Sequence, residues 1–213
     1  MLNRLKSRGL LYSLGIVFNR VVPERIFRFR IFRIFEIGLP TEKAIEIPAP
    51  DGITFRWCET DEDFAQARSL TYFQSESGGE GPESPKRACL AIDTDEPMGT
   101  QTIGGVWIGD DYFDETELGV RILLTENQSW IFAAMVAKAH RRRRIYRRLL
   151  WHVVASQKQT LFASINPTNK ASIAAHAPFI RRTAGTCIVL RILGRTFCRV
   201  GGSLSIKGNE ITI

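Results

Sequence analysis

The sequence is poor in the residues that hold metal ions or build disulfide frameworks. Its 213 residues include four cysteines and three histidines. No two cysteines form a C-x-x-C pair and no histidine stands at ligand spacing from Cys58, Cys89, Cys187 or Cys198. These spacings support neither a zinc site nor a redox motif, so no metal is expected. We expect reduced, mostly buried thiols in a cytoplasmic protein.

Long apolar runs are also missing. No segment reaches the roughly 18 apolar residues that a membrane-spanning helix needs. The longest candidate, residues 10–18, follows a basic stretch as the core of a signal peptide would. Asn19, Arg20 and Val21 come next, however, and no small-residue cleavage site follows. We therefore expect this segment to stay in the mature protein.

Residues 2–18 are instead typical of a basic amphipathic helix. Residues 1–33 as a whole carry eight basic side chains and one acidic side chain. Such a segment can lie in the interface of an anionic bilayer, or pack its apolar face on the rest of the protein. Charge complementarity with the acidic middle of the chain favours the packed arrangement. Peripheral membrane contact through residues 1–33 is the alternative.

Acidic residues are nearly absent from the last third of the chain. Residues 136–213 hold 15 basic side chains and a single acidic one, Glu210, for a net charge of +14. Residues 34–135 hold 20 acidic and six basic side chains, for a net charge of −14. The last third should therefore face an anionic partner, and the middle can accept a cationic one.

The 44% hydrophobic composition is sufficient for a folded core. The stretch 48–52, with two prolines and a glycine, separates an N-terminal extension, residues 1–40, from a main domain, residues 50–205. In the extension we expect a short helix at 23–29 and a strand at 31–38. In the main domain the patterns predict strands at 53–58, 88–93, 100–108, 130–136, 161–165, 186–193 and 196–200, and helices at 61–70, 145–157 and 170–179. This order predicts an α/β domain on a mixed sheet.

The most informative stretch is 136–150, where an apolar strand ends, a basic loop follows and an amphipathic helix begins near Ile145. A helix N-terminus presents unpaired N–H groups and a partial positive charge, so arginines in the preceding loop suit a phosphate. The arginine run also fits a solvated face or a nucleic-acid-binding patch, although the usual interleaved aromatic residues are missing. The apolar strand and helix on either side favour phosphate binding.

This strand, loop and helix resemble the pyrophosphate loop of the GNAT acyltransferase superfamily, Gln/Arg-x-x-Gly-x-Gly/Ala followed by a helix that begins with Leu-Leu. Arg141 takes the leading position, and Leu149 and Leu150 fit the helix. Both glycine positions are filled, by Arg144 and Tyr146, where the family uses glycine to let backbone amides approach the pyrophosphate. Arg144 either binds phosphate through its guanidinium group or obstructs the cofactor.

A second match lies downstream, in residues 166–176. Asn169 and Ser172 resemble the Asn and Ser that open the family's next helix, facing the pantetheine arm. His176 falls where many members keep a tyrosine that protonates the leaving thiolate, whereas the usual Gly-Phe after it is absent. Helix capping by Asn169 and packing of His176 in a helix are the structural alternatives.

The resemblance covers about residues 50–200 and implies a GNAT-like α/β (α+β) fold, with a mixed, mostly antiparallel sheet flanked by helices and a basic helical extension before it. It also implies acetyl-CoA as cosubstrate, attacked directly by a primary amine of a small molecule or peptide. The residues expected to bind acetyl-CoA are Met135, Val136, Arg141, Arg142, Arg143, Arg144, Ile145, Tyr146, Asn169 and Ser172.

The same resemblance suggests catalytic roles. Backbone N–H groups around Met135 and Val136 would polarise the thioester carbonyl, and His176 would protonate the leaving thiolate. Glu117 is the base we predict, with Glu115 or a water molecule as alternatives. The acidic residues at 110–117 form either a solvated loop or a site for the amine.

Two other functions fit the same residues. One is a GNAT-fold protein that has lost activity and serves as an interaction domain. The other is a basic protein that binds nucleic acid or a membrane surface, although no specific nucleic acid is expected. We predict a cytoplasmic location, with a membrane-peripheral one as the alternative.

Overall fold

The computed structural model describes residues 15, 17–19, 21–23, 26–40, 52–70, 76–77, 87–95, 101–115 and 118–213. Its strands are β1 (Phe27–Ile37), β2 (Ile53–Trp57), β3 (Glu76–Ser77), β4 (Arg87–Asp93), β5 (Gln101–Gly109), β6 (Tyr112–Glu115), β7 (Val120–Leu123), β8 (Gln128–Val136), β9 (Thr160–Ile165), β10 (Ile180–Ile192), β11 (Arg195–Gly202), β12 (Ser205–Lys207) and β13 (Glu210–Thr212). Its helices are α3 (Asp61–Leu70), α4 (Ile145–Ser156) and α5 (Lys170–His176), with 3₁₀ turns at Lys138–His140 and Ala177–Phe179. Within these ranges no helix has the length and apolarity needed to cross a bilayer.

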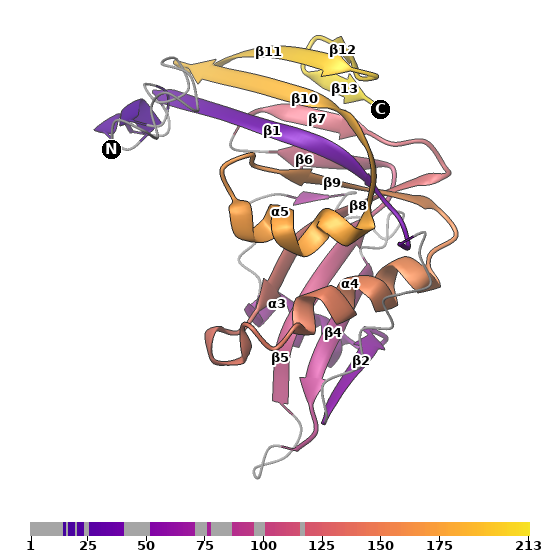
Figure 1. Ribbon diagram of the computed structural model, residues 1–213. Helices are drawn as coiled ribbons and strands as arrows, with labels where there is room; N and C mark the ends of the chain where they lie inside the picture. Colours follow the sequence, from indigo (N-terminus) through magenta and orange to yellow (C-terminus); the bar gives the residue numbers. More distant parts are fainter. Residues whose placement is uncertain are drawn as a thin grey trace.

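The main sheet has eight strands in the order β11-β10-β1-β9-β8-β5-β4-β2. Neighbouring strands pair antiparallel except β8 and β9, which are parallel. A parallel pair needs a crossover, and α4 provides it between β8 and β9 (Figure 1). The prediction of a mixed, mostly antiparallel sheet flanked by helices is confirmed.

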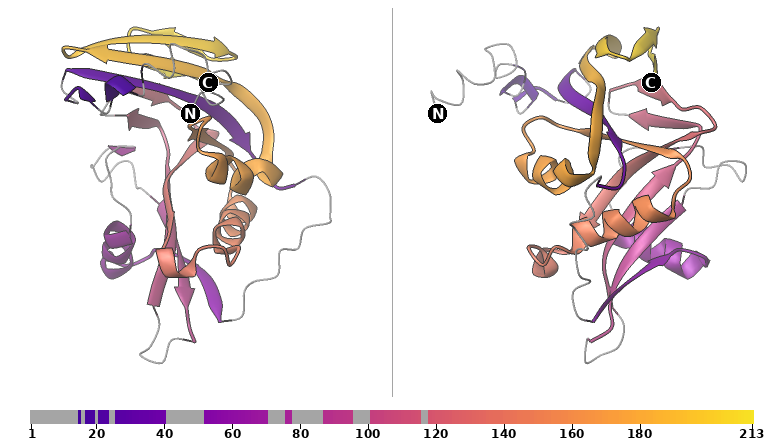
Figure 2. Two further views of the ribbon diagram at one scale, coloured as in Figure 1. Left: turned by 60° about the vertical axis from the view of Figure 1, so that its left-hand side comes forward. Right: turned by 45° about the vertical axis from the view of Figure 1, so that its right-hand side comes forward.

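Helices and a second sheet cover the two faces of the main sheet. On one face, Leu149, Leu150 and Val153 of α4 pack into a core with Val106 and Ile131. Helix α3 lies on the opposite side of the sheet (Figure 2). On that side the main sheet also packs on a five-stranded sheet of order β12-β13-β7-β6-β3, through a core that joins buried residues of both sheets.

Strand β1 lies inside the main sheet rather than beside it. It pairs with β10 along its whole length, from Phe27↔Ile192 to Ile37↔Ile180, and with β9 from Arg33 to Ile37. The helix expected at 23–29 is therefore wrong where the structure describes it, because residues 27–29 are strand. Large apolar residues alternate with arginines from 27 to 31, and this period-two pattern matches the two faces of a strand. Most of the amphipathic helix expected at 2–18 lies outside the described residues.

Most other elements agree with the sequence patterns. Thr60 caps α3, since its Oγ1 accepts a hydrogen bond from the backbone N–H of Asp63 at 3.2 Å. Strands β3, β6, β7, β12 and β13 were not expected, and part of the acidic loop is strand β6. All four cysteines are free thiols, as predicted, and burial raises the pKa of Cys89 to about 12.

Candidate functional site

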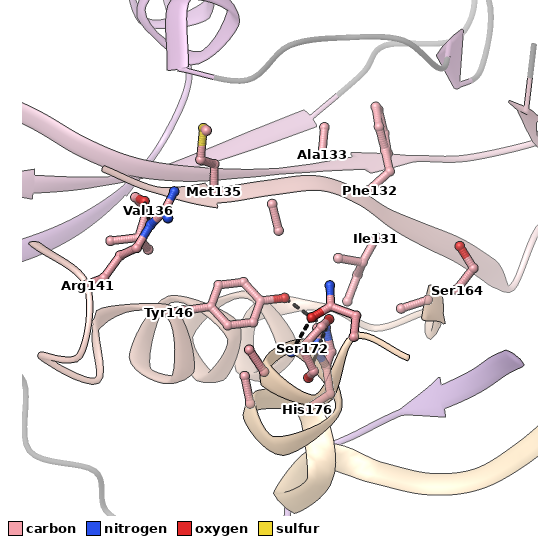
Figure 3. Close-up of a pocket in the computed structure, with 15 residues that line it drawn as sticks. Ile131, Phe132, Ala133, Met135, Val136, Arg141, Tyr146, Ser164, Ser172 and His176 are labelled. Carbon is pink, nitrogen blue, oxygen red and sulfur yellow. Dashed lines mark hydrogen bonds between the residues drawn. The ribbon is translucent and has the colours of Figure 1, made fainter. Parts of the chain in front are cut away.

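The parallel strands β8 and β9 separate part of the way along their length. Their paired residues run from Gln128↔Thr160 to Ile131↔Ala163, and within the described residues no pair follows. A bulge in β8 shifts its register with β5 between Phe132 and Met135, and Ala133 inside the bulge has φ +45°. Such a bulge bends the strand away from its neighbour. The separation opens a cavity of about 540 Å³ between β8, α4 and α5 (Figure 3).

Seven of the predicted site residues line this one cavity: Met135, Val136, Arg141, Tyr146, Asn169, Ser172 and His176. They come from the end of β8, from the loop and first turn of α4, and from α5 with its cap. Met135 points away from the cavity in Figure 3, so its backbone faces the open space. The lining also includes Ser164 of β9, which sequence analysis did not single out.

The arginine loop forms the entrance to α4. The Nε of Arg141 donates to the carbonyl oxygen of Val136 at 3.0 Å, which holds the loop against the end of β8. Arg142 and Arg144 both adopt left-handed backbone conformations, with φ of 69° and 61°. Arg144 stands at one of the positions where the resemblance expected glycine, and its backbone adopts the conformation that glycine enters without cost.

Four predicted residues of this loop do not line the cavity: Arg142, Arg143, Arg144 and Ile145. Arg143 turns instead to the carboxylate of Asp93, at 3.5 Å, and to His140, at 3.2 Å. The side chain of Ile145 is buried in a small core with Ile103 and Val136. A ligand could therefore contact Ile145 only through its backbone.

Tyr146 and His176 form a hydrogen-bonded pair at the wall of the cavity. The Nδ1 of His176 lies 2.8 Å from the carbonyl oxygen of Ser172, which can only accept, so Nδ1 carries the proton. In the neutral ring Nε2 is then an acceptor, and the hydroxyl of Tyr146 donates to it at 2.8 Å. Burial lowers the pKa of His176, and the Ser172 carbonyl partly opposes that shift. Burial also raises the pKa of Tyr146, so both groups are neutral near pH 7.

Asn169 and Ser172 serve the start of α5. The Oδ1 of Asn169 accepts a hydrogen bond from the backbone N–H of Ser172 at 3.1 Å, which is an N-cap contact. The hydroxyl of Ser172 lies 3.4 Å from Nδ1 of His176. Asn169 therefore caps α5 and, like Ser172, also lines the cavity.

The described acidic residues among 110–117 do not line this cavity. Glu117 is outside the described residues. Glu115 lies in β6, 3.3 Å from Arg30, and lines a second cavity of about 390 Å³. Asp110 pairs with Arg87 at 2.9 Å, and Asp114 pairs with Arg121 through both carboxylate oxygens. Each of these three carboxylates therefore has an arginine partner.

The hydroxyl of Tyr146 is a polar group of the cavity wall that sequence analysis did not single out, because Tyr146 was expected only to replace a loop glycine and to contact acetyl-CoA. Its position could nevertheless have been predicted from the sequence. A residue in the first turn of a helix after a phosphate loop lies beside the ligand, and a tyrosine there carries a polar group into an apolar wall.

Comparisons with known proteins give only distant similarities. No known protein family matches the sequence, and no curated protein does. Three solved structures are similar: a Drosophila melanogaster protein (TM-score 0.48, 14% identity), a GCN5-related N-acetyltransferase from Kribbella flavida (0.43, 14%) and a functionally unknown conserved protein from Staphylococcus epidermidis (0.46, 7%). The matches cover 91%, 74% and 78% of this chain, and 57%, 55% and 62% of those chains. The chain thus spans less than two thirds of each neighbour, and similarities of this degree assign no function.

Proposed function

We propose that the protein transfers an acetyl group from acetyl-CoA to a primary amine. The observation that carries this proposal is the cavity between the separated strands β8 and β9. It has a helix N-terminus preceded by arginines at one end and the Tyr146–His176 pair at its wall. A thioester substrate with a long, narrow arm and a pyrophosphate needs both features.

The start of α4 supplies the anion-binding end. The first N–H inside the helix that bonds to a carbonyl of the chain is that of Arg148, to Arg144, at 3.2 Å. The N–H groups of Ile145, Tyr146 and Arg147 precede it and have no partner within the helix. Together with the charge of the arginine loop they suit a pyrophosphate. Arg141 lines the cavity, and no other arginine of the described residues does.

The exposed edge of β8 supplies the polar contacts for the arm. Beyond Ile131 the backbone of β8 has no partner in β9, so the polar groups on that edge, those of alternate residues between 132 and 136, are open toward the cavity. A thioester carbonyl placed there can accept a hydrogen bond from a backbone N–H near Met135 or Val136. That contact strengthens as negative charge develops on the oxygen during attack.

The Tyr146 hydroxyl is the proton donor in this proposal. The attacking amine forms an N–C bond, the C–S bond breaks, and the thiolate takes the Tyr146 proton. The proton lost by the amine passes to water or to Glu117, and solvent returns a proton to Tyr146. His176 acts through Tyr146 as a positioning residue, because its Nε2 is an acceptor and carries no proton to give. The acceptor is an amine of a small molecule or a peptide.

Acetyl-CoA binding tests the proposal first. A ligand specific to the folded chain, at a hundredfold excess over its Kd, should raise Tm by about 5–10 °C. Differential scanning fluorimetry measures the shift, with adenosine as the comparison ligand. A shift no larger than that given by adenosine would contradict the proposal and favour an interaction domain without cofactor binding.

The Tyr146→Phe variant then separates binding from chemistry. We expect it to keep the Tm shift with acetyl-CoA and to lower kcat on any accepted amine by about two decades. Arg68→Gln, an exposed change on α3, is the matched control and should leave both quantities unchanged. An unaltered kcat in Tyr146→Phe would remove Tyr146 from the mechanism.

A further inference from the structure

The exposed large apolar side chains of the described residues all lie in one region. They are Val17, Phe18, Val21 and Ile26 before β1, and Ile188, Ile192, Leu193 and Phe197 in the β10–β11 hairpin. The two groups adjoin each other. The N–H of Leu193 donates to the carbonyl oxygen of Ile26 at 2.9 Å, Phe27 pairs with Ile192, and the rings of Phe18 and Phe27 are 5.5 Å apart. Scattered exposed apolar residues are ordinary, but a single concentration of them marks an interaction surface.

The strand register makes the hairpin part of this region one continuous sheet face. Ile188, Leu190 and Ile192 alternate with the buried residues Cys187 and Val189, so they share the opposite face of β10. Leu190 pairs with Phe197 of β11 on one side and with Phe29 of β1 on the other. We call Ile188, Leu190, Ile192, Leu193 and Phe197 the hairpin face.

Leu193, at the tip of the hairpin, lowers the stability of the folded chain. It is 75% exposed and occupies the turn with φ 49°, followed by Gly194 with φ 79°. Such turns favour Asn, Asp or Gly, because a side chain like leucine strains the left-handed conformation. A strained leucine that buries little surface within the chain is explained when something outside the chain buries it.

The charges around the hairpin face are of one sign. Arg195 and Arg199 are exposed, flank Phe197 on the same face, and oppose Ile192 and Ile188. Residues 180–202 contain five arginines and no acidic residue. The neighbouring residues 1–33 contain eight basic residues and one acidic residue. The surface that covers this face must therefore be both apolar and anionic.

We propose that the hairpin face binds the surface of an anionic phospholipid bilayer. Leu193, at the turn, and Phe197 enter the interface, while Arg195 and Arg199 contact the phosphate groups. The turn of the hairpin and the start of β1 lie together at one end of the sheet, far from β2 (Figure 1), so both can reach a flat surface at once. A second copy of the chain fits less well, because it would bring the same arginines against these. The proposal is independent of the acetyl transfer.

Co-sedimentation of the full chain with vesicles tests the proposal. We expect pelleting with vesicles of phosphatidylcholine and phosphatidylglycerol, and little with phosphatidylcholine alone. Leu193→Asn should lower the partition coefficient roughly tenfold, since a buried leucine is lost. The variant should keep or raise Tm, because asparagine tolerates the left-handed turn. A lost interaction therefore cannot be attributed to unfolding.

Charge variants test the second half of the proposal. Arg195→Gln with Arg199→Gln should lower binding to the anionic vesicles roughly tenfold or more. The matched control, Arg68→Gln with Lys158→Gln, removes the same charge from exposed positions elsewhere and should change binding by less than about twofold. Phe197→Trp should bind like the original chain, with a blue shift of the added emission on anionic vesicles.

Three results would overturn the proposal. The first is no pelleting with anionic vesicles. The second is unchanged pelleting of Leu193→Asn, which would assign any binding to another part of the chain. The third is a concentration-dependent dimer, seen by sedimentation velocity, that Leu193→Asn abolishes while vesicles bind neither protein; a second copy would then cover the face.

Discussion

Arg144 shows at the scale of one residue how a loop can keep the backbone of a glycine without the glycine. Its φ of 61° places it in the left-handed region, where a side chain other than that of glycine costs about 1 kcal/mol. No side-chain hydrogen bond from Arg144 caps α4. No cap on α4 offsets this strain, and a phosphate held by the guanidinium group would offset it.

The Arg144→Gly variant separates strain from ligand binding. We expect it to raise the free energy of unfolding by about 1 kcal/mol, and Tm by about 2–4 °C, because glycine enters this conformation freely. We also expect weaker binding of acetyl-CoA in calorimetric titration, because a charged contact is lost. Arg148→Gly, inside α4, is the control and should lower stability by about 1 kcal/mol. Tighter binding in Arg144→Gly would mean that the arginine obstructs the site.

His176 makes stability depend on pH. Its pKa is lowered below the ordinary value of 6.5, mainly by burial, so the unfolded chain binds more protons than the folded chain in the range between the two values. Stability from the neutral ring is thus fully present above about pH 6.5 and is lost as the pH falls from there toward the folded-state pKa. His152, whose pKa is lowered by burial and by the charge of Arg148, acts in the same direction.

Denaturant unfolding at a series of pH values measures this dependence. We expect His176→Gln to flatten the fall in the free energy of unfolding below pH 6.5, and His152→Gln to flatten the remainder. The two changes should add, because His152 stacks on Phe55 whereas His176 is hydrogen-bonded to Tyr146 and Ser172. If both variants keep the full slope of the original chain, other groups govern its acid sensitivity.

At the scale of the elements, the sequence patterns predicted the elements that line the cavity better than the short strands of the five-stranded sheet. The strand ending at Val136, the loop and helix α4 were readable because an apolar run, a basic loop and a helical repeat follow one another. The small sheet was missed, because β12 and β13 have three residues each, too few to show a period. Their place depends on Ile211 and Ile122 meeting in the core, and the sequence alone does not disclose such distant contacts.

Hydrogen-bond chemistry was harder to predict than position. The sequence spacing predicted the position of His176. It did not predict the tautomer, because the tautomer depends on a hydrogen bond to the Ser172 carbonyl of the same helix. Its pairing with Tyr146 depends on how α4 and α5 pack together. Likewise, the acidic residues at 110–115 looked like a free surface cluster until the fold brought Arg30, Arg87 and Arg121 against them.

At the scale of the whole molecule, some charges of the basic and acidic segments form ion pairs with each other. Arg30 of the basic first segment pairs with Glu115 of the acidic middle. Arg143 and Arg182 of the basic last third pair with Asp93 and Glu36. Pairs this exposed contribute little stability, about 0–1 kcal/mol each, but opposite charges favour the correct approach of the segments. Arg195 and Arg199, which flank the hairpin face, have no acidic residue within residues 180–202, and in our proposal they contact lipid phosphates.

Strand β1 joins the N-terminal segment to the rest of the molecule, so a chain starting at residue 40 should not fold. The deletion removes four buried side chains, Phe32, Ile34, Phe35 and Ile37, each stabilising the fold by about 1.5–3 kcal/mol. Their total is comparable to the whole stability of a typical domain, about 5–15 kcal/mol. The deletion also exposes the backbone edges of β9 and β10, which favours aggregation.

For the chain starting at residue 40 we expect no cooperative thermal transition by circular dichroism. A deletion of residues 1–14 leaves every described residue in place and should keep one. A cooperative transition of the shorter chain within a few degrees of the full chain would instead make β1 dispensable, and the sheet would then have to close by pairing β9 directly with β10.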